Sequence, residues 1–210
     1  MKKKIIICIA ETIVVVLLSF HVLFLGHVNL AIWRRIINIF VVLLLGFSGF
    51  FAAKLSGYEI EFKWNNSKQY FIGLFIAILL ATAIGVIPTV CGFNTIGGHE
   101  DFKFAAFTYY FFYFIFLIGP VEEMIFRVYY QKFFVEVFAN HKWIGVIVAS
   151  FLFGLWHIIN GSWIQVLFTF GIGLVFGFAK EYLKDINYPG VALSHGVYDF
   201  LLNCLRFFLV

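Results

Sequence analysis

Two adjacent acidic residues, Glu122 and Glu123, lie in a stretch that is otherwise apolar, and Arg127 follows four residues after the second. Charged side chains at membrane depth are costly, and where they occur they commonly mark substrate pathways or proton relays. Residues four apart share a face of a helix, whereas adjacent residues point about 100° apart. We therefore expect Glu123 to pair with Arg127 and Glu122 to be available for chemistry. The alternative is that both glutamates only stabilise packing or the start of a helix after Pro120.

Two later apolar segments carry histidines at the same spacing. His157 follows Phe153 by four residues, and His195 precedes Asp199 by four. The Phe153 ring can wall one side of the His157 imidazole, and Asp199 can orient His195. Each histidine taken alone is equally a hydrogen-bonded packing residue. Carboxylates and imidazoles together can accept and relay the protons of a hydrolysis, so the set suits a hydrolase.

In order along the chain, these three segments resemble the CPBP family (CAAX proteases and bacteriocin-processing proteins, also called Abi), which is related to type II CAAX prenyl endopeptidases. The family pattern is Glu-Glu-x-x-x-Arg, then Phe-x-x-x-His, then His-x-x-x-Asn or Asp, and the resemblance covers about Gly119–Asn203. The prenyl-protein proteases of the family have asparagine where this chain has Asp199. The resemblance implies hydrolysis of a peptide bond within the membrane, and bacterial relatives are linked to bacteriocin maturation and self-immunity.

The resemblance also implies roles for individual residues. Glu122 and His157 would activate the water molecule, His195 with Asp199 would complete the catalytic site, and the structural support would come from Glu123, Arg127 and Phe153. Two mechanisms stay open. Two histidines and a carboxylate (His157, His195 and Glu122) suit a catalytic Zn²⁺ with one open position, but the same residues can act without a metal. The zincin motif H-E-x-x-H is absent from the sequence.

The composition indicates a membrane protein. Of 210 residues, 63% are hydrophobic and 12% are charged, whereas soluble domains have about 45–50% apolar and about 25% charged residues. The apolar runs are continuous, unlike the alternating strands of a membrane β-barrel. Because each crossing takes roughly 20 residues, we expect an all-α, polytopic bundle of about seven (six to eight) membrane helices, forming one domain over residues 1–210.

The predicted crossings are approximately residues 5–25, 36–53, 70–90, 104–138 (interrupted at Pro120), 143–159, 163–179 and 191–210. With a cytoplasmic N-terminus, ten lysines face the cytoplasm and four basic residues lie outside, as the positive-inside rule favours. Glu11 and Glu136 fall near predicted interfaces, where their side chains can reach water. We therefore expect a multi-pass protein of the cell membrane.

The net charge of +4 is modest and the basic residues are scattered, so the expected partners are the lipid bilayer and a membrane-associated peptide or protein, with no nucleic acid. Two other functions remain. One is a non-enzymatic bacteriocin-immunity or scaffold protein that keeps the protease fold. The other is a transporter, because intramembrane acids and histidines also build proton relays. The sequence lacks two matching halves with interrupted helices, which argues against a transporter.

Overall fold

The computed structural model describes residues 1–25, 31–93, 95–159 and 161–209, and within these ranges the regular elements are all helices. This confirms the all-α prediction. Among the described residues, six helical segments are long and apolar enough to cross a membrane: Lys2–Leu25, Ala31–Leu55, Ser67–Val90, Phe104–Val137, Ala139–Ile159 and Trp163–Tyr182. The protein is therefore a multi-pass helical membrane protein. The last predicted crossing corresponds to α11 (Tyr188–Leu205), whose hydropathy is lowered by its polar residues, and it is not among these six.

The chain divides into two compact units. Unit 1 comprises Met1–Glu61 and Val121–Lys184. Its helices are α1 (Lys2–Ser19), α2 (His21–Leu25), α3 (Ala31–Leu55), α8 (Gln131–Val137), α9 (Lys142–Trp156) and α10 (Trp163–Tyr182), with a π-helical segment at Met124–Tyr130 and 3₁₀ turns at Ala139–His141 and His157–Ile159. The interpretation of residues 1–210 as one domain stays a prediction.

Unit 2 comprises Phe62–Pro120 and Asp185–Val210. Its helices are α4 (Ser67–Ala81), α5 (Ile87–Val90), α6 (Phe104–Tyr113) and α11, with π-helical segments at Thr82–Val86 and Phe114–Ile118. The short helix α7 (Gly119–Glu123) begins in unit 2 and ends in unit 1. Residues 104–137 are helical throughout, so Pro120 does not end the helix. Proline lacks an N–H donor, and π-helical segments flank α7 on both sides.

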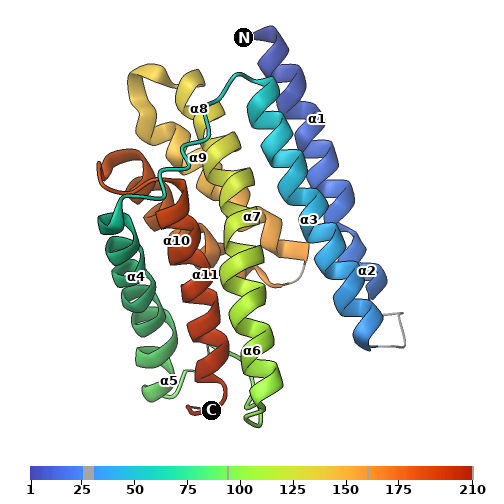
Figure 1. Cartoon of the computed structure of the whole chain (residues 1–210), viewed down its shortest axis with the longest axis vertical. Coiled ribbons are helices and arrows are strands. Elements are labelled where there is room, and N and C mark those ends of the chain that lie inside the picture. Colours follow the sequence, from blue (N-terminus) through green and yellow to red (C-terminus); the bar gives the residue numbers. More distant parts are fainter. Residues whose placement is uncertain (26–30, 94, 160, 210) are drawn as a thin grey trace. The chain divides into compact units, whose positions relative to one another are not determined.

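Within unit 1, α1 and α3 run side by side, and α9 packs against both α8 and α10 (Figure 1). The approach of α9 to α10 depends on Gly154, where a Cβ atom would lie 2.8 Å from the main-chain oxygen of Val166. No larger residue fits without moving one helix. In this packing, one face of α9 lies against the helix that carries Glu122 and Glu123. The side-chain contacts between these two helices are described in the next section.

Glu11 and Glu136, the two glutamates of unit 1 that were predicted near membrane interfaces, differ in their burial. Glu136 behaves as expected: it pairs with Lys4 at 2.6 Å and accepts a hydrogen bond from the Tyr58 hydroxyl. Burial raises the pKa of the Tyr58 phenol, which therefore stays a donor. The Glu11 side chain, which was expected to reach water, does not. Its side chain is buried between α1 and α3, where it accepts a hydrogen bond of 2.9 Å from the Ser48 hydroxyl, because the face of α1 that carries Glu11 packs inward.

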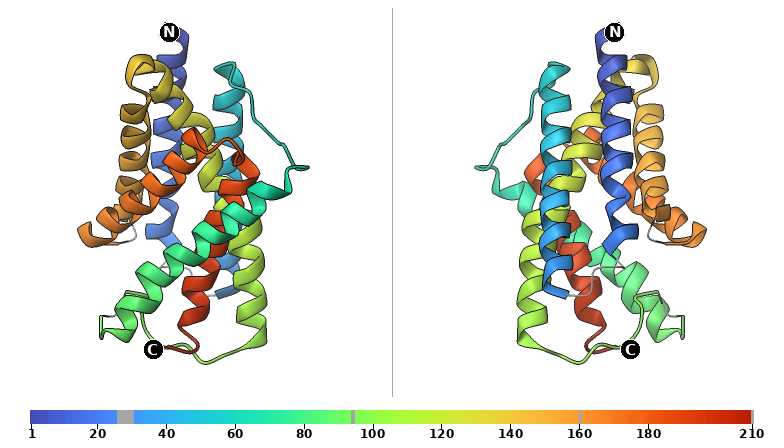
Figure 2. Two further views of the ribbon diagram at one scale, coloured as in Figure 1. Left: turned by 90° about the vertical axis from the view of Figure 1, so that its left-hand side faces the viewer. Right: turned by 90° about the vertical axis from the view of Figure 1, so that its right-hand side faces the viewer.

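Within unit 2, α4 packs along α11 (Figure 2). Helix α11 is also held against the start of α7. A Cβ atom on Gly119 would lie 2.5 Å from the main-chain oxygen of Ala192 and 2.6 Å from the main-chain nitrogen of Gly196, so the two backbones are nearly in contact. The Tyr188 hydroxyl adds a hydrogen bond of 3.0 Å to the oxygen of Pro120. These contacts set the position of α11 within the unit.

Candidate active site

The structure brings Glu122 of α7 and His157, at the end of α9, together within unit 1. The distance between Glu122 Oε2 and His157 Nε2 is 4.0 Å. Both side chains are largely buried. This separation exceeds that of a direct hydrogen bond but lets one water molecule bond to both atoms at once.

The orientation of the His157 imidazole is set by its own helix. Its Nδ1 atom lies 2.9 Å from the main-chain oxygen of Phe153. A carbonyl oxygen can only accept a hydrogen bond, so Nδ1 carries the proton. In the neutral imidazole the other nitrogen, Nε2, then has a free electron pair, and this is the nitrogen that faces Glu122. His157 is therefore arranged as a proton acceptor on the side of the carboxylate.

The Phe153 side chain has two contacts that explain its place in the motif. Its ring lies edge-to-face with the His157 imidazole, with 4.8 Å between centroids. The Arg127 guanidinium lies over the same ring, 5.2 Å from its centroid. Aromatic pairs and cation–π contacts of this kind contribute about 0.5–2 kcal/mol each. Phe153 thus connects the buried ion pair to the histidine.

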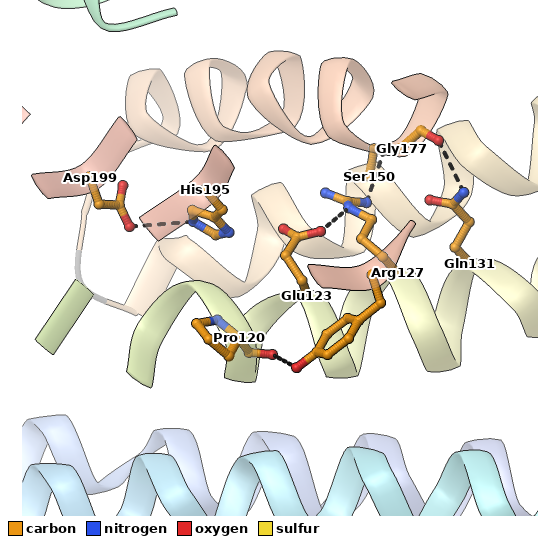
Figure 3. A network of polar contacts seen from close by, with 9 residues as sticks. Pro120, Glu123, Arg127, Gln131, Ser150, Gly177, His195 and Asp199 are labelled. Carbon is orange, nitrogen blue, oxygen red and sulfur yellow. Dashed lines mark hydrogen bonds and ion pairs between the residues drawn. The ribbon is translucent and has the colours of Figure 1, made fainter. Parts of the chain in front are cut away.

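Glu123 and Arg127 form a fully buried ion pair along one face of the helix, with 3.2 Å between Nε and the carboxylate (Figure 3). Arg127 Nη1 also donates to the Ser150 hydroxyl of α9 at 3.4 Å. One turn later, the buried Gln131 side chain donates to the main-chain oxygen of Gly177 on α10 at 3.1 Å. The face formed by Glu123, Arg127 and Gln131 therefore joins the acidic helix to α9 and α10. These contacts hold the three helices together.

His195 and Asp199 lie in unit 2, on one face of α11 (Figure 3). His195 Nε2 is 3.3 Å from the Asp199 carboxylate. His195 is buried, and Asp199 is partly exposed. The Asn203 amide donates to the main-chain oxygen of Asp199 at 2.9 Å. Asp199 therefore orients the imidazole of His195.

Within unit 1, Glu122 and His157 could each provide a ligand to a metal ion. A catalytic zinc needs three protein ligands. The third candidate ligand, His195, lies in unit 2, so the zinc site stays a prediction. The mechanism proposed below uses the side chains alone.

Two polar residues of this network, Gln131 and Ser150, were not among the residues selected from the sequence. Gln131 could have been found, because it follows Arg127 by four residues, just as Arg127 follows Glu123. Ser150 lies on a different helix and has no spacing relation to Arg127. Only the packing of α9 brings the two together.

The family model described as type II CAAX prenyl endopeptidase Rce1-like matches residues 104–201, just under half of the chain. The matched segment contains all three motifs, and it confirms the resemblance to the CPBP family that they indicated. No curated protein and no solved structure matches the chain.

Proposed function

Because residues 104–201 form an Rce1-like segment, we propose that this protein is an endopeptidase that hydrolyses a peptide bond of a membrane-associated peptide or protein within the bilayer. The observation that carries the proposal is the pair of Glu122 and His157, with the unprotonated nitrogen of the neutral imidazole facing a carboxylate at 4.0 Å. A protein that only binds a partner does not need such a pair. This argues against the non-enzymatic scaffold.

In the proposed reaction, a water molecule donates one hydrogen to the Glu122 carboxylate and the other to His157 Nε2. One of the lone pairs on its oxygen then points at the scissile carbonyl carbon. Glu122 accepts a proton as the water oxygen bonds to that carbon, and the carbonyl electrons move to the carbonyl oxygen. When the carbon–nitrogen bond breaks, those electrons re-form the carbonyl group and the amine leaves with the proton held by Glu122. The new carboxyl group passes the second proton of the water to His157 Nε2, which releases it to solvent, so the products are a carboxylate and an amine.

We propose that His195 and Asp199 act on the same intermediate. The tetrahedral oxyanion needs hydrogen-bond donors, and a donor in such a position contributes about 2.7–4 kcal/mol to transition-state stabilisation. His195, oriented by Asp199 at 3.3 Å, would supply this donor in its protonated form. Glu123 and Arg127 keep the acidic helix in place and take no part in proton transfer.

The substrate is proposed by class. The matched family description names prenyl endopeptidases, so a peptide ending in a prenylated CAAX sequence is the first candidate. A role in bacteriocin maturation or self-immunity stays a prediction from the CPBP resemblance. So do the location in the cell membrane and the cytoplasmic N-terminus, which rest on the distribution of lysines.

The test uses the full-length protein in liposomes with two quenched-fluorescent peptides: one ends in a farnesylated CAAX sequence, and the other is an unprenylated transmembrane peptide. We expect cleavage of at least one peptide by the wild type and none by Glu122→Gln. Glu136→Gln is the matched control, because it alters an exposed acid of the same long helix and should leave cleavage unchanged. Peptide binding without cleavage, equal in wild type and Glu122→Gln, would support the scaffold instead.

A further inference from the structure

Trp156, the residue before His157, contacts helix α1. Its indole Nε1 donates a hydrogen bond to the hydroxyl of Ser19, the last residue of α1. Ser19 is 4% exposed, and its own hydroxyl donates to the main-chain oxygen of Val15 at 2.6 Å. Because the hydroxyl hydrogen is used in that bond, the oxygen presents an electron pair to the indole. Both partners of the contact are therefore fixed in orientation.

The indole in turn contacts the histidine. The Trp156 and His157 rings lie edge-to-face, with 5.4 Å between centroids. The Phe126 ring packs on the Trp156 ring, with 5.5 Å between the two centroids. The His157 imidazole is thus bounded by two aromatic rings, Trp156 and Phe153. Rotation of either ring would give the imidazole room to turn away from Glu122.

We infer that Ser19 is a positioning residue for His157 and acts through Trp156. The inference rests on the proposed function, and it adds a helix to the active site that lies outside the matched residues 104–201. An indole N–H that is buried without an acceptor keeps its desolvation penalty uncompensated, so without Ser19 the indole rotates toward another partner. The imidazole then loses one wall and its fixed Nδ1 bond to Phe153. A displacement of about 1 Å at a reacting group can lower a rate by two orders of magnitude.

The same helix offers a matched control. Thr12 of α1 lies 2.9 Å from the hydroxyl of Tyr130, on the long helix that carries Glu122. The Tyr130 ring reaches Trp156 through ring contacts with Phe126, whereas Ser19 accepts the hydrogen bond of the indole directly. If α1 serves only as an anchor, loss of either hydroxyl should have the same effect. If Ser19 positions His157, only the loss of Ser19 should change catalysis.

The first experiment measures kcat and KM with the farnesylated peptide for Ser19→Ala, Ser19→Thr, Thr12→Val and Trp156→Phe. We expect Ser19→Ala to lower kcat about tenfold with KM unchanged. Ser19→Thr keeps the hydroxyl and should therefore have the kcat of the wild type. Thr12→Val should alter only the Tm. The double variant Ser19→Ala/Trp156→Phe should be no slower than Trp156→Phe, because both changes remove the same bond. Equal losses in Ser19→Ala and Thr12→Val, or additive losses in the double variant, would overturn the inference.

A second readout does not depend on peptidase activity. In protein labelled with ¹⁵N-histidine, the His157 signals are identified by their loss in His157→Gln, and their shifts report which nitrogen carries the proton. We expect one Nδ1-protonated form in the wild type and in Thr12→Val, and a second form in Ser19→Ala. An unchanged His157 spectrum in Ser19→Ala would overturn the inference. If the spectrum changes but no peptide is cleaved, the positioning role stands and the proposed function fails.

Discussion

His157 Nδ1 lies 2.9 Å from the main-chain oxygen of Phe153, one turn earlier in α9. The partner is a main-chain atom, so the bond persists whatever side chain occupies position 153. This hydrogen bond explains why Phe153 and His157 are four residues apart in the motif. The phenylalanine carbonyl fixes the proton on Nδ1, and the phenylalanine ring walls the imidazole. In the neutral ring, the nitrogen that faces Glu122 is thereby the one that carries the lone pair.

Glu122→Gln and His157→Gln should each lower kcat by about 10²–10⁴-fold, because each removes a group that accepts a proton from water. The Tm in detergent should change little, since glutamine keeps the shape of glutamate and approximates that of histidine. Peptide hydrolysis and thermal unfolding of the purified variants check this. Wild-type turnover by either folded variant would show that the pair does not activate the water.

Arg127→Met should destabilise the protein by about 3–5 kcal/mol, because it leaves the buried Glu123 carboxylate uncompensated. The double variant Glu123→Leu/Arg127→Met should recover much of this loss, since an apolar pair of similar volume removes both charges. Thermal or denaturant unfolding in detergent measures the difference. The pair of exposed Lys142 and partly buried Glu181, with 3.9 Å between the charged atoms, is the control, and its loss should cost about 0–1 kcal/mol. A stable but inactive Arg127→Met would contradict the structural role.

Metal chelation should leave peptide hydrolysis unchanged. In the proposed mechanism Glu122 and His157 themselves interact with the attacking water, and no step requires a metal ion. The measurements are activity after treatment with 1,10-phenanthroline and the zinc content of the purified protein. Loss of activity that added Zn²⁺ restores, together with stoichiometric zinc, would establish the metal-dependent alternative.

Gly119→Ala should destabilise unit 2 strongly, because the added Cβ atom would lie 2.5 Å from the main-chain oxygen of Ala192. Backbone atoms cannot move aside as a flexible side chain can, and overpacking of this kind typically costs about 1–3 kcal/mol. Gly171→Ala is the control, since its Cβ would meet nothing within 4 Å. Tm values for both variants in the same detergent provide the comparison. Equal Tm values would mean that α11 does not pack on α7 as described.

Cysteines introduced at Val121 and Val197 should react with a membrane-impermeant maleimide from the cytoplasmic side only. The reason is that ten lysines face the cytoplasm when the N-terminus is placed there, and the proposed site needs water from that side. The native cysteines Cys8, Cys91 and Cys204 are first replaced by serine or alanine. Labelling from the outer face in right-side-out vesicles would reverse the proposed orientation.

Much of this protein follows from its sequence. The continuous apolar runs predict a polytopic helical bundle. Only helices and closed β-barrels satisfy their backbone hydrogen bonds within lipid, and the apolar residues of this sequence do not alternate with polar ones as they do in the strands of a barrel. The pairing of Glu123 with Arg127 follows from a spacing of four on one helix. The order of three short motifs indicated a resemblance to the CPBP family, which the Rce1-like match to residues 104–201 supports. Each of these depends only on residues that are near one another along the chain.

The tertiary structure decided what depends on how helices pack. Ser150 reaches Arg127, Ser48 reaches Glu11, and Ser19 reaches Trp156 across 137 positions of sequence. The expectation that Glu11 lies at an interface was wrong for this reason: its face of α1 turns toward α3. Helical periodicity determines which residues share a face, but the neighbour of that face is set by close packing between helices. That packing also brings His157 Nε2 to Glu122.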